Sequence, residues 1–256
     1  MNNKVANPEV IIKVEDLTIG YGDRVLMENL NFEVRRGEIF FIMGSSGCGK
    51  STLLKHMIGL NEPMRGEILI HGKSIVSAEG DAKLALMRDF GVTYQGGALL
   101  GSLTVAENVA MPLEEHSTLG PAAIAAEVKK KLALVGLAGF GNFMPAELSG
   151  GMRKRAGLAR ALALDPKLLF FDEPSAGLDP ISSAALDKLI RDLRETLGTT
   201  VIIISHELDS IFSIADRIIM LDRDARGIIA DGDPRELVKS AENPEVRRFL
   251  SRDGMK

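Results

Sequence analysis

The residues most able to do chemistry form a glycine-rich run that lies between an apolar segment and a helical one. The run begins at Gly44 and reaches Lys50 and Ser51 with the spacing G-x-x-x-x-G-K-[ST]. Glycines let backbone N–H groups turn inward around phosphate oxygens, and the dipole of the following helix adds to the attraction. We therefore expect Lys50 on the β- and γ-phosphates of ATP and the Ser51 hydroxyl on Mg²⁺. The expected phosphate-binding residues are Gly44, Ser45, Ser46, Gly47, Cys48, Gly49, Lys50, Ser51 and Thr52.

A second chemical signal is a pair of carboxylates at the end of an apolar strand. The predicted strand Lys167–Phe171 is followed directly by Asp172 and Glu173. Because the carboxyl ends of parallel strands line the ligand crevice, both carboxylates are expected beside the phosphate loop. Asp172 would then help to hold Mg²⁺, through water, and Glu173 would polarise the attacking water. A helix-capping or solvated acidic pair is the alternative interpretation.

A third signal is Leu148-Ser149-Gly150-Gly151-Met152, which opens a predicted helix. Ser149 is suited to cap that helix, and Gly150 and Gly151 leave backbone N–H groups free to face a phosphate. Taken alone, the motif is an ordinary helix start. Its place in the chain, after the phosphate loop and before the two carboxylates, favours a functional role.

These residues need elements that bring them together. Apolar and β-branched segments alternate with helical patterns along the chain, which predicts an α/β fold with a mainly parallel core sheet and an N-terminal antiparallel β part. Residues from about 96 to 160 are mostly helical in pattern, which predicts an inserted helical subdomain. Two starts of the N-cap-plus-proline type predict a C-terminal helical tail over about 233–256. We expect residues 1–256 to form a single domain.

The main predicted elements can be given by their ranges. The expected strands are Val10–Leu17, Asn29–Val34, Ile39–Met43, Gly66–Ile70, Gly91–Tyr94, Lys167–Phe171, Val201–Ile204, Arg217–Leu221 and Gly227–Ala230. The expected helices are Ser51–Ile58, Ala82–Arg88, Val105–Leu113, Pro121–Val135, Ser149–Leu164 and Ile181–Leu197.

Composition narrows the class of protein. The 256 residues carry 31 basic and 35 acidic side chains, so a net charge of −4 argues against a nucleic-acid binder. One cysteine excludes an internal disulfide framework and favours a reducing compartment. No apolar run approaches the roughly 20 residues of a membrane span, and none follows Lys4 as in a signal peptide. We therefore expect a protein that does not itself cross a membrane.

The order of phosphate loop, Leu-Ser-Gly-Gly and Asp-Glu resembles that of the ABC-type ATPases over nearly the whole chain. This resemblance implies a P-loop NTPase fold and further site residues. Tyr21 matches the aromatic residue that stacks on adenine, and Gln95 matches the glutamine that senses Mg²⁺ and the γ-phosphate. His206 matches the γ-phosphate histidine. Ser175-Ala176-Gly177-Leu178-Asp179 matches the loop that couples two ATP sites.

The same resemblance implies that two copies sandwich the nucleotides head to tail. Ser149 and Gly151 of one copy would cover the γ-phosphate that Lys50 of the other copy binds. ATP would close the pair and hydrolysis would reopen it. Because the chain carries one set of motifs, it is expected to need another chain to complete each site.

Four further runs resemble the ATPases of the Mce/Mla class, which drive phospholipid transport in bacteria with two membranes. Met152 stands where many family members have glutamine, but the phosphate donors of the backbone are kept. The implied partners are an integral membrane permease, an Mce-domain protein in the periplasm and a small STAS-like cytoplasmic subunit. The ATPase would lie on the cytoplasmic face of the inner membrane. The four runs are Leu148–Arg155, Tyr94–Leu100, Ser102–Val109 and Asp209–Phe212.

Permease contact is expected near Gly96–Leu113, just after Gln95, because a γ-phosphate sensor beside a docking surface can convert hydrolysis into permease movement. The alternative for this segment is plain subdomain core. Two other functions stay open: the ATPase of a small-solute importer and, less favoured, an ABC ATPase outside transport. ABC ATPases that act in DNA repair carry long coiled coils between their motifs, and those that act on the ribosome usually carry two ATPase cassettes in one chain. Neither feature is present in this sequence.

Other reactive or charged residues receive no functional role from the sequence. The spacing of His56, His71 and His116 predicts no metal site. Cys48 is expected to fill a position in the loop that any small residue fits, although a reagent on it could block ATP. Lys129-Lys130-Lys131 and Arg153-Lys154-Arg155 are expected to be solvated helix faces, with docking or anionic-lipid contact as the alternative.

Overall fold

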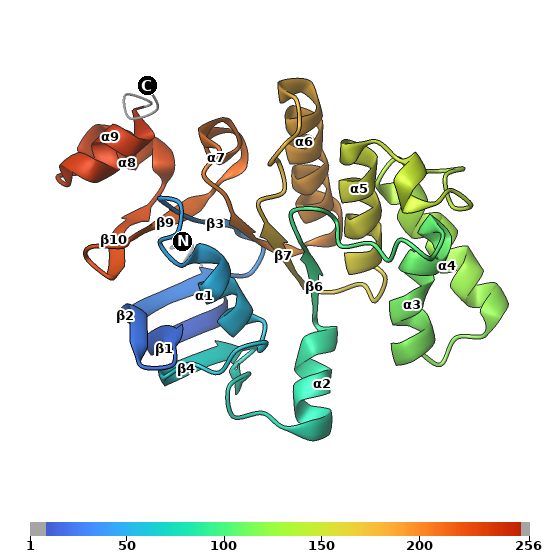
Figure 1. The fold of residues 1–256 in the computed structure, drawn as a ribbon, viewed down its shortest axis with the longest axis horizontal. Coiled ribbons are helices and arrows are strands. Elements are labelled where there is room, and N and C mark those ends of the chain that lie inside the picture. Colours follow the sequence, from blue (N-terminus) through green and yellow to red (C-terminus); the bar gives the residue numbers. More distant parts are fainter. Residues whose placement is uncertain (1–8, 252–256) are drawn as a thin grey trace, which may run out of the picture.

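A six-stranded sheet forms the centre of the computed structural model, which describes residues 9–251 (Figure 1). The strand order is β10-β9-β3-β8-β7-β6, and β10 alone of these strands pairs antiparallel, at the edge. All six residues of β3 are buried, as expected for a parallel strand covered on both faces. The bounds are β3 Ile39–Gly44, β6 Phe90–Thr93, β7 Leu168–Asp172, β8 Thr200–Ile204, β9 Arg217–Asp222 and β10 Gly227–Gly232.

A second, antiparallel sheet of order β2-β1-β4-β5 packs below the first. Its strands β1 and β4 alternate between buried and more exposed positions, because one face meets the core and the other meets water. Helix α1 contacts β1 of this sheet and β3, β7 and β8 of the larger one. The helix that follows the glycine-rich loop is thus held between the two sheets (Figure 1). The bounds are β1 Val10–Tyr21, β2 Arg24–Arg35, β4 Arg65–Ile70, β5 Lys73–Ser74 and α1 Lys50–Met57.

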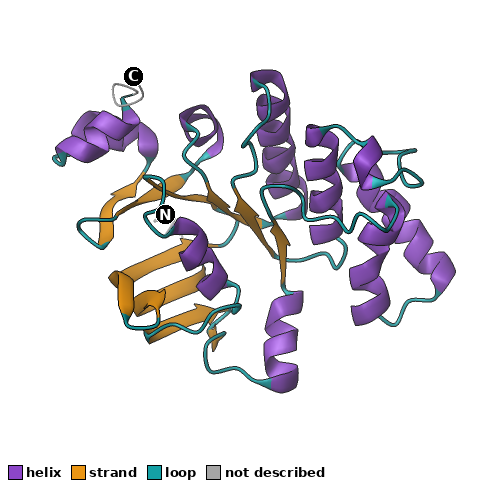
Figure 2. Cartoon of the chain, viewed as in Figure 1, coloured by secondary structure: helices purple, strands orange, loops and turns teal. Residues whose placement is uncertain are grey.

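Helices α3 to α9 pack into the core on the other face of the large sheet, and α3 and α4 lie past its β6 end, whereas α2 lies on the α1 side, below β6 (Figure 2). Helices α3, α4 and α5 pack on one another, and α5 also packs on β6, so α5 joins this group to the central sheet. Helix α3 begins with a capping box, in which Thr104 and Glu107 satisfy each other's backbone N–H groups. The bounds are α2 Gly80–Arg88, α3 Val105–His116, α4 Pro121–Leu134, η1 Pro145–Glu147, α5 Gly150–Ala161, α6 Pro180–Leu197, α7 Leu208–Ile214, α8 Pro234–Ser240 and α9 Pro244–Leu250.

The predicted fold class is confirmed, and the local differences have physical causes. Helix α5 ends at Ala161 rather than at Leu164, and the turn that follows leads to Asp165, whose left-handed φ of 51° ahead of Pro166 cannot continue a helix. Strand β1 continues through Tyr21, so the turn to β2 is limited to Gly22 and Asp23. Helix α7 was not expected from the sequence.

The boundaries given for the domain stay a prediction. Between residues 96 and 160 the structure places α3, α4, η1 and α5, and no strand lies within that described segment. Residues 234–250 of the predicted tail hold α8 and α9, while 252–256 lie outside the described residues. Residues 1–8, whose sequence predicts no signal peptide, also lie outside them. Within 9–251, no helix combines the length and the apolar character that a membrane span requires.

Candidate functional site

The glycine-rich loop joins the end of β3 to the start of α1, as its sequence predicts. Gly44 has φ 148°, and a Cβ added there would lie 2.4 Å from the carbonyl oxygen of Leu221, so the loop can start only from glycine. Lys50 is 8% exposed, and its ammonium donates to the carbonyls of Gly44 at 2.8 Å and Ser45 at 3.0 Å. The charge of Lys50 is therefore held inside the loop, where it can meet phosphate oxygens.

A hydroxyl and a carboxylate meet beside this loop. The Ser51 hydroxyl donates to Oδ1 of Asp172 at 3.1 Å, which joins the first turn of α1 to the carboxyl end of β7. Both oxygens are hard ligands of the kind that Mg²⁺ prefers, and Mg²⁺ sites typically use one or two carboxylates together with substrate phosphates. Among residues 9–251 no cluster of three or more His, Cys, Asp or Glu side chains forms an all-protein metal cage. The residues present thus fit a Mg²⁺ ion that is shared with a nucleotide.

Glu173 and His206 form the polar pair of the site. Nδ1 of His206 lies 2.9 Å from Oε1 of Glu173, and the Glu173 side chain is 16% exposed against 50% for His206. The second carboxylate oxygen, Oε2, is buried and has no hydrogen-bond partner among the described residues. Glu173 has φ 51°, a left-handed conformation that is uncommon outside glycine and that occurs at functional sites. Its backbone N–H donates to Ile204, which fixes the residue against β8.

One cavity of about 690 Å³ collects most of the predicted residues. The Tyr21 hydroxyl lies 3.0 Å from that of Thr52, and Tyr21 is 54% exposed, so its ring is accessible to a ligand. The sequence did not point to Arg24, Leu26 or Phe249, and Phe249 comes from α9 at the far end of the chain. The lining residues are Tyr21, Arg24, Leu26, Gly44, Ser45, Ser46, Gly47, Gly49, Lys50, Ser51, Thr52, Glu173, His206 and Phe249.

The Leu-Ser-Gly-Gly motif lies apart from that cavity. Ser149 caps α5, and its hydroxyl accepts a hydrogen bond from the Met152 N–H at 3.2 Å. Ser149 and Gly151 line a different cavity, of about 410 Å³, together with Leu178 and residues of α4 and α6. Gly150 is the first residue of α5. A single chain therefore does not bring this helix start to Lys50.

Gln95 and Asp179 also lie outside both cavities. Gln95 is exposed and follows β6 and Tyr94, whose pKa is raised by burial and by the charge of Asp172. Asp179 caps α6 and accepts hydrogen bonds from the N–H groups of Ile181 and Ser182. The hydroxyl of Ser182 donates as well, and these bonds lower the pKa of the Asp179 carboxyl.

Cys48, His56 and His71 take structural places. Cys48 is 2% exposed, and burial raises the pKa of its thiol. Nδ1 of His56 lies 2.7 Å from the carbonyl of Thr52, within the α1 helix, and Nε2 of His71 lies 3.8 Å from Asp89.

The expectation that both basic runs are solvated helix faces is wrong for four side chains. Lys131 is 2% exposed, and its ammonium lies 2.5 Å from Asp165. Arg153, Lys154 and Arg155 are partly buried and donate to backbone carbonyls. A polar helix face can satisfy neighbouring loops instead of water, and helical spacing does not distinguish the two cases.

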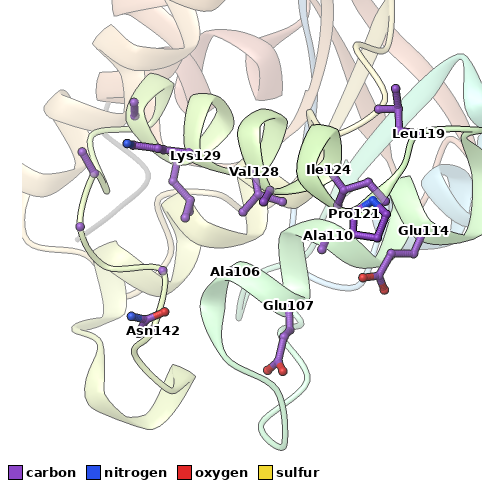
Figure 3. A pocket seen from close by; sticks show the side chains of 16 residues that line it. Ala106, Glu107, Ala110, Glu114, Leu119, Pro121, Ile124, Val128, Lys129 and Asn142 are labelled. Carbon is purple, nitrogen blue, oxygen red and sulfur yellow. The ribbon is translucent and has the colours of Figure 1, made fainter.

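A further cavity, of about 680 Å³, lies between α3 and α4. Figure 3 shows Ile124 and Val128 of α4 above it and Ala106, Glu107 and Ala110 of α3 below. None of the predicted site residues lines this cavity, although Ala106 and Ala110 belong to the segment expected to meet a permease.

Comparison with known proteins supplies the family context. Residues 27–176 match the sequence profile described as "ABC transporter". The chain is 43% identical over 241 residues to "Intermembrane phospholipid transport system ATP-binding protein MlaF" of Haemophilus influenzae, covering 94% of this chain and 90% of that one. The Escherichia coli K12 protein of the same name is 40% identical, covering 98% and 91%. "Probable ribonucleotide transport ATP-binding protein mkl" of Mycobacterium leprae is 41% identical, covering 94% and 69%.

Solved structures agree with this assignment of the fold. The structure of cbiO1 from Clostridium perfringens, described as part of the ABC transporter complex cbiONQ, has a TM-score of 0.82 and 30% identity over 96% of this chain and 98% of that chain. The dimeric ATP-binding cassette MJ0796, bound to ADP and Pi in a post-hydrolysis state, has a TM-score of 0.78 and 29% identity over 87% and 98%.

Proposed function

Since the chain belongs to the ABC transporter family and is an ATPase of that family, we propose that it powers phospholipid movement between an inner and an outer membrane through a separate permease. The proposal for the cargo rests on 40–43% identity to two proteins named for intermembrane phospholipid transport. The proposal for the ATP site rests on the geometry around the 690 Å³ cavity.

The glycine-rich loop, the start of α1 and the exposed side chain of Tyr21 bind ATP. The backbone N–H groups of residues 44–52 and the Lys50 ammonium take the phosphates, because they present donors and positive charge in one concave loop. Tyr21 provides a face for the adenine ring at the open side of the same cavity. The base and the phosphates thus occupy a single continuous space.

Mg²⁺ is held by Ser51 and Asp172, with Gln95 as a further ligand or sensor. When bound, the ion neutralises charge that develops on the β- and γ-phosphates. The residues of this chain place two hard oxygens 3.1 Å apart beside the loop.

Glu173 polarises the attacking water. The contact between its carboxylate and the imidazole of His206 is the observation that carries this enzymatic proposal. One carboxylate oxygen is occupied by His206, and the other is buried and free of protein partners among residues 9–251. Glu173 lines the cavity that holds the phosphate loop, and a carboxylate there suits a water molecule whose proton must be drawn away. His206 holds the carboxylate in place and faces the γ-phosphate from its more exposed side.

Two copies of the chain complete each site. Support comes from two cavities of the chain, because Ser149 and Gly151 line one and Lys50 lines the other. In a head-to-tail pair, Ser149, Gly150 and Gly151 of one copy supply N–H donors to the γ-phosphate bound by the other. Asp179 holds the start of α6 at the contact between the copies.

Substitution of Glu173 by Gln tests the ATP site. The amide cannot take a proton, so Glu173→Gln should bind ATP, hydrolyse it at least about a hundredfold more slowly, and accumulate as an ATP-bound dimer. Size-exclusion chromatography with light scattering and a phosphate-release assay measure both effects. A variant that turns over ATP like the parent and stays monomeric would falsify the role given to Glu173.

Purification from the native membrane tests the transport assignment. We propose that the chain lies on the cytoplasmic face of the inner membrane with a permease, a STAS-like cytoplasmic subunit and an Mce-domain periplasmic protein, and that it binds no nucleic acid. Mass spectrometry of the complex should find these proteins together with phospholipid. The 41% identity to a protein named for ribonucleotide transport keeps a small-solute importer as the second candidate. A periplasmic solute-binding protein in place of the Mce-domain protein would establish that candidate.

A further inference from the structure

Lys154 connects the helix that follows Leu-Ser-Gly-Gly to the loop that follows Glu173. Its ammonium lies 2.6 Å from the carbonyl oxygen of Pro174 and 2.6 Å from that of Ala176. The side chain is partly buried; burial lowers its pKa, and the negative charge of Glu173 acts in the opposite direction. Two short bonds from a charged donor are among the stronger hydrogen bonds of a protein.

The two carbonyls that Lys154 binds lie next to the catalytic carboxylate. Pro174 follows Glu173 directly, and Glu173 adopts its left-handed conformation at this junction. The loop also closes on itself, since the Ala176 N–H donates to the carbonyl of Glu173. Any shift of the Pro174 and Ala176 carbonyls therefore turns the backbone that carries the Glu173 side chain.

Helix α5 carries contacts at three levels along its length. Its first turn holds Ser149 to Gly151, and Lys154 follows one turn later. Near its end, Arg160 donates to the carbonyls of Gly97 at 3.2 Å and Ala98 at 2.7 Å, in the loop after Gln95. A short helix transmits displacement as a rigid body because its own hydrogen bonds resist bending.

We propose that Lys154 is a positioning residue, which makes the orientation of Glu173 depend on whether the start of α5 is engaged by the nucleotide of a second copy. It does not touch the reacting atoms; it acts through the backbone of Pro174 and Ala176. The inference rests on the proposed two-copy function. Lys154 thereby takes a coupling role, although it belongs to a basic run that the sequence predicted to be a solvated helix face, with docking or anionic-lipid contact as the alternative. ATP bound by one copy thereby orients Glu173 of the other copy, which is the residue that polarises water at the other site.

The test compares Lys154→Met with Lys154→Arg. Methionine keeps the length of the side chain and removes the charge and all donors, whereas arginine keeps a charged group that can bond both carbonyls. Lys130→Met is the matched control, because Lys130 is exposed on α4 and pairs only at 3.4 Å with Glu127. The readouts are kcat, KM, the Hill coefficient for ATP, the melting temperature, and ATP affinity in the Glu173→Gln background.

Lys154→Met should lower kcat by about tenfold or more and bring the Hill coefficient toward one, while KM and ATP affinity stay within about twofold. Lys154→Arg should restore most of the cooperativity, and Lys130→Met should match the parent. A Lys154→Met protein with the parental kcat and Hill coefficient overturns the inference alone. So does a loss of activity that merely follows a lower melting temperature and is not rescued by arginine. A parent chain without cooperative hydrolysis overturns the two-copy function, and the inference with it.

Discussion

Nδ1 of His206 lies 2.9 Å from Oε1 of Glu173, although 33 positions of sequence separate the two residues. The contact joins the ends of β7 and β8, which pair in parallel in the large sheet. Strand pairing therefore places the Glu173 carboxylate and the His206 imidazole at the carboxyl edge of the sheet. The left-handed backbone of Glu173 directs its carboxylate toward that edge. One carboxylate oxygen of Glu173 thus has a fixed partner, and the other, Oε2, is buried with no hydrogen-bond partner among residues 9–251.

Removal of the imidazole should slow hydrolysis without preventing nucleotide binding. His206→Ala frees the Glu173 carboxylate to rotate, and we expect kcat to fall by about a hundredfold while ATP affinity changes little. His116→Ala is the control, because His116 is exposed at the end of α3 and lines none of the described cavities near the loop. Steady-state phosphate release and fluorescent-nucleotide titration measure the two quantities. Equal losses in binding and turnover would place His206 in nucleotide binding instead.

The Ser51–Asp172 contact predicts a change in the requirement for Mg²⁺. Asp172→Asn removes a negative charge but keeps the size of the side chain, so half-maximal activity should need about tenfold more Mg²⁺. ATP binding in EDTA should be unchanged, because the loop and Lys50 remain. Asp192→Asn, an exposed change on α6, serves as the control. An unchanged Mg²⁺ titration would remove Asp172 from the ion site.

The burial of Cys48 predicts how the rate of thiol labelling depends on pH. Burial raises the pKa of this thiol, so at neutral pH less thiolate is present in the folded chain than in the unfolded chain, and alkylation should be slower in the fold. The rate should rise about tenfold per pH unit through the alkaline range until the raised pKa is reached. Iodoacetamide labelling followed by mass spectrometry, with urea-unfolded protein as the reference, measures it.

The same experiment tests whether the loop has room for a modified thiol. ATP should protect Cys48, and the alkylated chain should no longer bind ATP, since Cys48 packs behind Gly44 in the loop. Cys48→Ser should bind ATP normally and resist the reagent. Retained ATP binding after complete labelling would dismiss the steric argument.

Local sequence patterns predict much of the fold and of the candidate site. The parts that they do not predict depend on contacts that form only in the folded chain. The loop from Gly44 to Ser51 is contiguous, so its spacing alone predicts a strand, a turn and a helix. Asp172 and Glu173 were expected at the site because parallel strands share one carboxyl edge. The partly buried state of Lys154 was not expected, since helical periodicity distinguishes faces but not what covers a polar face. Its partners, the Pro174 and Ala176 carbonyls, arise only once the loop has folded.

Phe249 shows the same limit for contacts that are distant in sequence. No spacing rule relates α9 to β1, yet Phe249 and Tyr21 line one cavity. Helix α9 is anchored by Val246 and Leu250, which are 0% and 2% exposed, so the intervening Phe249 is held at the cavity while its neighbours enter the core. Only the packing of the tail on the sheet could reveal this.

Phe249 should contribute to binding the nucleotide base. Aromatic contacts are worth about 0.5–1.5 kcal/mol beyond the area they bury, so Phe249→Ala should weaken ATP binding by up to about tenfold. Because the triphosphate contacts stay intact, inorganic triphosphate should compete for the parent and the variant with equal affinity. Phe249→Leu keeps an apolar side chain and controls for the packing of α9, and a thermal melt should show both variants folded. If Phe249→Ala weakens triphosphate and ATP alike, the tail supports the loop rather than the base; if neither changes, Phe249 only closes the cavity wall.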